Sequence, residues 1–176
     1  APNKKGKEVI DERIAYQITS ILSDESVRPE EYWRTQLTVP GFQTAAKTGT
    51  SNKCLERAKA QNENAFGRCI DSKPDNTWTI GYTPNLVTGV WAGNASGGAL
   101  YVKASGLNTA SPLWRRFMIT AHKHIGATVR EPSLRSSFNI PEDLASAQIS
   151  ELSGKLASSC TPLEHRRAEV FFEGEE

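Results

Sequence analysis

Apolar residues recur every three or four positions in two stretches of the chain, which is the spacing of an amphipathic helix. The first stretch predicts a helix over residues 8–23 with an apolar stripe of Ile10, Ile14, Ile18, Ile21 and Leu22. The second predicts a helix over residues 112–125 with a buried stripe of Leu113, Phe117, Ala121 and Ile125. Ser111 would cap this second helix, and Gly126 would end it.

Alternation of apolar and polar residues predicts strands between the two helices. In residues 77–82 the large apolar side chains share one face. A second β-rich run covers residues 86–92, and the turn signal at 83–85 joins the two runs as an antiparallel hairpin. A glycine-rich loop follows at 93–98, and residues 100–102 predict a brief further strand.

Two polar segments fall outside this pattern. Residues 53–75 are rich in charged and amide side chains and predict an insertion between two strands, with a short helix inside it. Residues 142–176 predict a poorly packed extension, because strong apolar anchors are few there.

Charge and composition exclude several classes of protein. The 176 residues carry 21 basic and 20 acidic side chains, a formal charge of +1, which argues against a nucleic-acid-binding protein. No apolar run approaches the roughly 20 residues that a transmembrane helix needs. We expect no metal or other cofactor, because no CxxC pair occurs and His122 and His124, two positions apart on a helix, cannot readily share an ion.

Two of the three cysteines, Cys54 and Cys69, bracket much of the polar insertion. A disulfide between them would close a loop and stabilise the fold by about 3 kcal/mol in the loop-entropy model. In a reducing compartment the two would instead remain free thiols.

The chemistry-bearing stretch is the tetrad Lys47-Thr48-Gly49-Thr50. On a strand, Thr48 and Thr50 would share one face about 7 Å apart, so both hydroxyls could reach one carboxylate. Lys47 would lean the other way and supply a positive charge, and Gly49 would let a substrate or another backbone come close. An ordinary edge strand with a solvated lysine is the alternative for a motif this short.

Two further motifs follow the Lys47–Thr50 tetrad in order: Trp78 to Pro84 spells W-x-x-G-Y-T-P, and Pro112 to Met118 spells P-x-W-x-x-F-M. This order of motifs resembles the transpeptidase domain of class A penicillin-binding proteins, the bifunctional peptidoglycan synthases of the bacterial envelope. The three motifs would correspond to the KTG strand, the hairpin and the helix of that family. The resemblance implies an α+β fold, the serine transpeptidase and β-lactamase architecture of an antiparallel sheet flanked by helices. It would be incomplete in this chain, which would supply the last three strands and the closing helix.

The resemblance also implies a role for each residue of the tetrad. Lys47 would help hold the proton network and the negative charge of the substrate. The hydroxyls of Thr48 and Thr50 would bind the terminal carboxylate of a D-Ala-D-Ala stem peptide or a β-lactam, with Gly49 lining the site. The Thr50 N–H would form half of the oxyanion hole.

The chain departs from the family in lacking two of its three motifs. The family uses S-x-x-K, S-x-N and then K-T-G, but no serine here has a lysine three positions on. Ser137-Phe138-Asn139 spells S-x-N in the wrong order, after the tetrad, and we regard it as a coincidence. The nucleophile is therefore expected in an N-terminal remainder of the transpeptidase, with the glycosyltransferase domain as a further partner.

We expect residues 1–130 to be the C-terminal part of a D,D-transpeptidase domain on the outer face of the bacterial cytoplasmic membrane. Residues 131–176 would form a C-terminal extension. The chain alone would be inactive. A non-catalytic envelope module that binds a partner or peptidoglycan is the alternative, and a serine β-lactamase fragment is a weaker one.

Overall fold

The computed structural model describes residues 7, 9–28, 30–59, 67–128 and 134–172. The chain divides into two compact units, one formed by residues 1–21 with 139–176 and the other by residues 22–138. The division of the chain into regions 1–130 and 131–176 stays a prediction.

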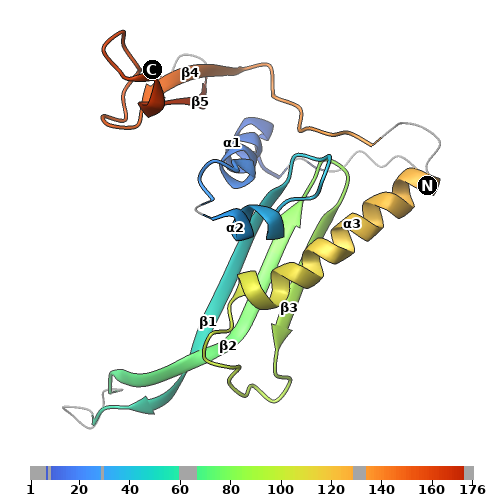
Figure 1. Cartoon of the computed structure of the whole chain (residues 1–176), viewed down its shortest axis with the longest axis vertical. Helices are drawn as coiled ribbons and strands as arrows, with labels where there is room; N and C mark the ends of the chain where they lie inside the picture. Colours follow the sequence, from blue (N-terminus) through green and yellow to red (C-terminus); the bar gives the residue numbers. More distant parts are fainter. Residues whose placement is uncertain (1–6, 8, 29, 60–66, 129–133, 173–176) are drawn as a thin grey trace. The chain divides into compact units, whose positions relative to one another are not determined.

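The larger unit is built on a three-stranded antiparallel sheet in the order β1-β2-β3 (Figure 1). Its elements are α2 (Glu31–Gln36), β1 (Ala45–Arg57), β2 (Cys69–Tyr82), β3 (Val87–Gly93), the π-helix η1 (Gly106–Ala110) and α3 (Ser111–Thr128). The predicted hairpin is confirmed, because β2 pairs with β3 from Asn76↔Gly93 to Tyr82↔Val87. The antiparallel sheet with flanking helices is the predicted fold class.

Helix α3 crosses one face of this sheet and contributes Trp114 and Met118 to the core (Figure 1). Trp114 and Met118 are fully buried, and the Trp114 indole N–H donates to the carbonyl of Thr88 at 3.1 Å. Gly81 on β2 makes room for this tryptophan, since a Cβ there would collide with the indole ring and lie 3.0 Å from the Ala45 oxygen.

The predicted buried stripe of the second helix is wrong. Leu113 and Phe117 are 60% and 51% exposed, whereas the buried face carries Ser111, Trp114, Met118 and His122. Large apolar side chains lie on two neighbouring faces of this helix, one with Leu113 and Phe117 and one with Trp114 and Met118. The second face meets the sheet, because Trp114 fits the gap at Gly81.

The predicted ends of this helix are also wrong. Ser111 has helical backbone angles and a buried side chain, because η1 runs directly into α3 and leaves no helix terminus there. Ser105 is the cap instead: its hydroxyl accepts from the Asn108 N–H at 3.3 Å. Helix α3 continues through Gly126 to Thr128.

The polar insertion is a β-ribbon in its described part. Beyond β3, strands β1 and β2 continue as a pair from Asn52↔Pro74 to Arg57↔Cys69 (Figure 1). The expected short helix is wrong for residues 53–59 and 67–75, and residues 60–66 lie outside the described part. Most of the ribbon's side chains are exposed, so no alternation of apolar and polar residues reveals these strands. Residues 100–102 form no strand.

The smaller unit contains most of α1 (Glu12–Ser23) and a two-stranded antiparallel sheet. Its strands are β4 (Leu144–Ser150) and β5 (Arg166–Phe172), and the short helix η2 (Leu163–His165) directly precedes β5. The Arg13 guanidinium lies 4.9 Å from the centre of the Phe172 ring, a cation–π contact. The expected extension thus contains paired strands, although Ser150 is the one buried residue in its described part.

Candidate functional site

The tetrad lies in the first part of β1, which is an edge strand among the described residues. Opposite it on β2 stand Ile80, Thr79, Trp78 and Thr77, paired in turn with Lys47, Thr48, Gly49 and Thr50. The Lys47 ammonium is exposed and donates to the Thr48 carbonyl at 2.8 Å. The tetrad therefore borders the sheet and is not enclosed within it.

The two threonines of the tetrad face η1. Thr50 Oγ1 accepts a hydrogen bond of 3.1 Å from the Gly106 N–H, and a Cβ on Gly106 would lie 2.9 Å from the Thr48 Cβ. Strand alternation then places Lys47 and Gly49 on the opposite face. The arrangement matches the expectation that the two hydroxyls share a face and the lysine leans away.

Buried hydroxyls connect β2 to η1 below the tetrad. Thr77, Thr79 and Ser111 have no exposed surface. The Thr109 hydroxyl donates to Thr77 Oγ1 at 2.8 Å, and the hydroxyls of Thr79 and Ser111 lie 2.8 Å apart. These hydroxyl contacts therefore fix η1 and the start of α3 on the sheet.

The opposite side of the sheet, which we call the open face, carries both polar and large apolar side chains. Four of its large apolar side chains are 44–68% exposed: Trp78, Ile80, Val87 and Trp91. This face bears the side chain of Lys47 and is the side on which α3 does not lie (Figure 1).

A polar row crosses the open face next to the tetrad. The Ser51 hydroxyl donates to Asp75 Oδ1 at 2.7 Å, the Asn76 amide donates to Ser51 Oγ at 3.2 Å, and the Trp91 indole donates to Asn76 Oδ1 at 3.0 Å. The hydrogen bond from Ser51 holds the pKa of the Asp75 carboxyl below its usual range. The row ties all three strands together directly after Thr50. The sequence gives no signal for this row, because its members come from three separate strands.

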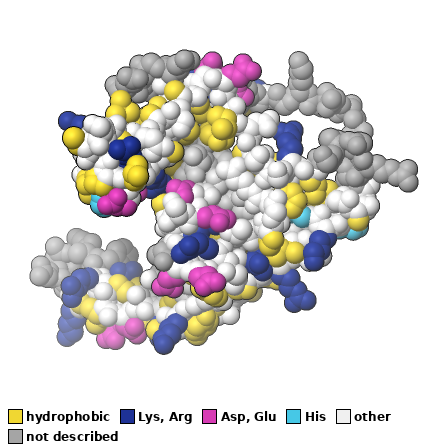
Figure 2. Space-filling model, turned by 45° about the horizontal axis from the view of Figure 1, so that its top comes forward, with side chains coloured by type: hydrophobic (Ala, Val, Ile, Leu, Met, Phe, Trp, Pro, Cys, Tyr) yellow, Lys and Arg dark blue, Asp and Glu magenta, His cyan; other side chains and the backbone are white. Residues whose placement is uncertain are grey.

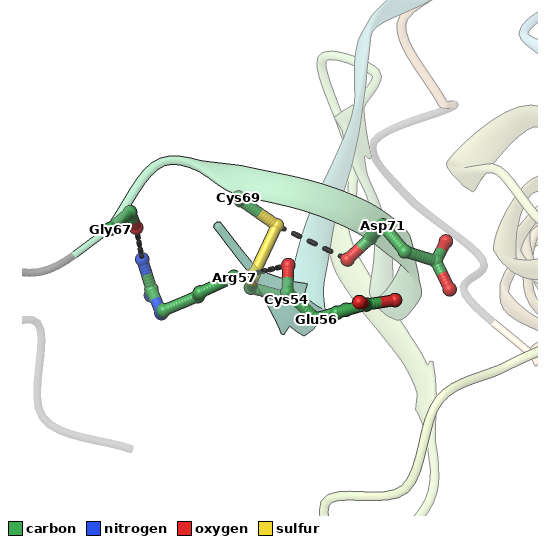
Figure 3. The surroundings of a disulfide bond; sticks show 6 residues. All are labelled: Cys54, Glu56, Arg57, Gly67, Cys69 and Asp71. Atoms are coloured by element: carbon green, nitrogen blue, oxygen red, sulfur yellow. Dashed lines mark hydrogen bonds between the residues drawn. A yellow bond between two sulfur atoms is a disulfide. The ribbon is translucent and has the colours of Figure 1, made fainter. Parts of the chain in front are cut away.

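Cys54 and Cys69 are joined by a disulfide across the ribbon (Figure 3). Their Cα atoms lie 5.8 Å apart, within the usual range for such a bond. Arg57 also donates to the Gly67 carbonyl at 3.1 Å, so two links hold this end of the ribbon together. Cys160 is an exposed free thiol.

In the part of the chain that the structure describes, the histidines and surface charges form no second candidate site. His122 is buried, with Nε2 2.8 Å from the Thr83 hydroxyl and Nδ1 2.8 Å from the Met118 oxygen. Within the described ranges, no three or more His, Cys, Asp or Glu side chains gather as metal ligands, and no helix is long and apolar enough to cross a membrane. On the face seen in Figure 2, basic and acidic side chains are interspersed.

Comparison with known proteins identifies the fold. The profile of the penicillin binding protein transpeptidase domain matches residues 1–118. The chain belongs to this transpeptidase family. Penicillin-binding protein 1A of Rickettsia felis is 32% identical over 156 residues, which is 89% of this chain and 16% of that protein.

More distant relatives cover as much of the chain. Penicillin-binding protein 1A of Pseudomonas aeruginosa is 29% identical over 88% of the chain and 15% of its own length. Penicillin-binding protein 1A/1B of Bacillus subtilis is 29% identical over 97% of the chain and 17% of its own length. The chain thus spans about a sixth of the length of the curated relatives it matches.

Proposed function

We propose that this chain supplies the substrate-carboxylate and oxyanion wall of a peptidoglycan D,D-transpeptidase. Lys47, Thr48, Gly49 and Thr50 would form that wall, and the serine nucleophile would come from a part of the protein outside these 176 residues. The observation that carries the proposal is the position of the intact tetrad on β1, an edge strand among the described residues, in a chain that belongs to the transpeptidase family.

Hydrogen-bond alternation along β1 supports the role of the Thr50 N–H. In an antiparallel pair, each residue of an edge strand turns both its N–H and its C=O either toward the neighbouring strand or away from it. The Thr48 oxygen is bound by the Lys47 ammonium. The residues Gly49 and Trp78 oppose each other, and both of their carbonyl oxygens lie next to the position that a Cβ on Gly106 would take. Both the Thr48 oxygen, which the Lys47 ammonium binds, and the paired Gly49 and Trp78 oxygens fit a register in which the backbone of Gly49 is hydrogen-bonded to β2. Because the pattern alternates along the strand, the N–H of Thr50 then points away from β2, to the free edge.

The reaction would be an acyl transfer. A serine attacks the carbonyl of the penultimate D-Ala and forms an acyl-enzyme, and the terminal D-Ala leaves. An amine of a neighbouring stem peptide then takes the acyl group. The Thr50 N–H would donate to the oxyanion, a contact whose loss raises the barrier by roughly 3–4 kcal/mol. The threonine hydroxyls and Lys47 would hold the terminal carboxylate, and no cofactor takes part.

The cellular setting follows from the same reaction. The substrates would be D-Ala-D-Ala stem peptides, and β-lactams would acylate the same serine. The domain would act on the outer face of the bacterial cytoplasmic membrane, together with the remainder of the transpeptidase and a glycosyltransferase domain. A disulfide in the ribbon is in keeping with an oxidising compartment.

Acylation kinetics of the longer protein test these roles. Thr48→Val removes a hydroxyl at nearly constant volume and should slow acylation by benzylpenicillin about tenfold or more, since a hydrogen bond to a charged group is worth about 1.5–3 kcal/mol. Lys53→Ala, on the ribbon beyond the tetrad, is the matched control and should react at the wild-type rate. Equal rates for Thr48→Val and wild type would reject carboxylate binding by this wall.

The absence of S-x-x-K from the 176 residues favours one alternative. A non-catalytic envelope module would keep the sheet and bind peptidoglycan or a protein without forming an acyl-enzyme. An S-x-x-K and an S-x-N upstream in the same reading frame would favour the enzyme, and a start codon near Ala1 would favour the module.

A further inference from the structure

Gly106, the first residue of η1, contacts the tetrad from the side that faces α3. Its N–H donates to Thr50 Oγ1 at 3.1 Å. This is the link between η1 and the hydroxyl that the proposed function assigns to carboxylate binding. The two residues are 56 positions apart in the chain, so sequence spacing gives no sign of the contact.

The position admits no side chain. A Cβ on Gly106 would collide with the Trp78 oxygen and would lie 2.8 Å from the Gly49 oxygen and 2.9 Å from the Thr48 Cβ. The Trp78 and Gly49 oxygens are backbone atoms of the β1–β2 strand pair, so they cannot rotate away as a side chain could. Only glycine therefore lets η1 come this close to the tetrad.

The other side of Gly106 is held as firmly. Its carbonyl oxygen lies 3.2 Å from the Thr79 hydroxyl and 3.0 Å from the Ser111 hydroxyl, and both of these side chains are fully buried. Ser105 caps the same turn through a capping box with Asn108. The peptide groups on both sides of Gly106 are thus fixed by hydrogen bonds.

This contact decides what the Thr50 hydroxyl can do. A hydroxyl has one proton to donate and two lone pairs. When the Gly106 N–H occupies one lone pair, the Thr50 oxygen is held in place and its proton is left to point elsewhere. A hydroxyl that accepts from a fixed N–H is also a stronger donor, because linked hydrogen bonds polarise each other.

We propose that Gly106 is a positioning residue for substrate specificity, which rests on the proposed function of Thr50. Its N–H orients the Thr50 hydroxyl as a donor toward the terminal carboxylate of the substrate. Gly106 itself does not touch the substrate. The discrimination between a ligand with a free carboxylate and one without it therefore depends on η1 as well as on β1.

The test compares acylation of the longer protein by benzylpenicillin and by its methyl ester, which lacks the charged carboxylate. Wild type should prefer the acid, and Thr50→Val should reduce this preference about tenfold or more. Gly106→Ala should reduce it to a similar extent, and adding Gly106→Ala to Thr50→Val should change the preference little further. Gly98→Ala is the matched control, because its new Cβ would come no closer than 3.4 Å to another atom.

A second pair of variants covers the case in which Gly106→Ala does not fold. Ser105→Ala removes the cap of η1 and should lower the acid-to-ester preference, and Ser105→Thr, which keeps the hydroxyl, should restore it. A purely structural role would slow acylation by both ligands equally and leave the acid-to-ester ratio unchanged in Gly106→Ala and in both Ser105 variants. That result, with Thr50→Val still losing the preference, would overturn the inference alone. A wild-type protein that shows no preference for the acid would overturn the proposed function of the tetrad instead.

Discussion

Replacing the ribbon disulfide by Cys54→Ser and Cys69→Ser should lower the stability of the larger unit. The two cysteines are 15 positions apart. In the loop-entropy model, a closure of this length removes about 3 kcal/mol of conformational entropy from the unfolded chain. A unit of this size loses about 4 °C in Tm per kcal/mol, so the double variant should melt about 12 °C below the oxidised protein.

The assay is thermal unfolding followed by circular dichroism without reductant. Cys160→Ser is the matched control, because Cys160 is an exposed free thiol, and it should melt with the wild type. The full effect requires that the ribbon keep its paired structure without the disulfide (Figure 3). A change in Tm below about 2 °C would refute this reasoning, because the ribbon would then be as disordered in the folded variant as in the unfolded chain.

Four further outcomes are expected. Trp114→Ala should lower the free energy of unfolding by about 3–5 kcal/mol in urea titration, because it empties a fully buried site; a loss below about 1 kcal/mol would contradict the packing. Arg28→Ala should cost about 3 kcal/mol by the same measurement, since it leaves the buried Thr44 oxygen and the part-buried Leu22 oxygen and Thr38 hydroxyl without their donor; a neutral variant would contradict this. Arg13 lowers the pKa of Asp11 from 3.8 to about 2, so the stability from this pair is present above about pH 4 and lost as the pH falls through 2; Asp11→Asn should flatten the dependence of Tm on pH in this window, and an unchanged profile would count against it. Light scattering should show self-association of the isolated chain through its open face, and a clean monomer at high concentration would refute that.

The sequence predicted the elements of the sheet better than their contacts. The β2–β3 hairpin follows from short alternating runs around a turn, which are local features. The face of α3 does not, because periodicity finds Leu113 and Phe117 as readily as Trp114. Only the gap at Gly81, on another element, selects the tryptophan.

The site shows the same division. The faces of Thr48 and Lys47 follow from the period of a strand, so the sequence predicted them. The contact of Gly106 with Thr50 joins residues far apart in the chain and could not be predicted. The ribbon was missed because its strands carry mostly exposed side chains.

Covalent labelling with a fluorescent penicillin tests the central claim most directly. We expect no adduct on the 176-residue chain alone. We expect one adduct per molecule, seen by intact mass, when the chain is joined to the N-terminal part of a transpeptidase that the proposed function requires. A stoichiometric adduct on the isolated chain would contradict the account, because a nucleophile would then lie within these residues.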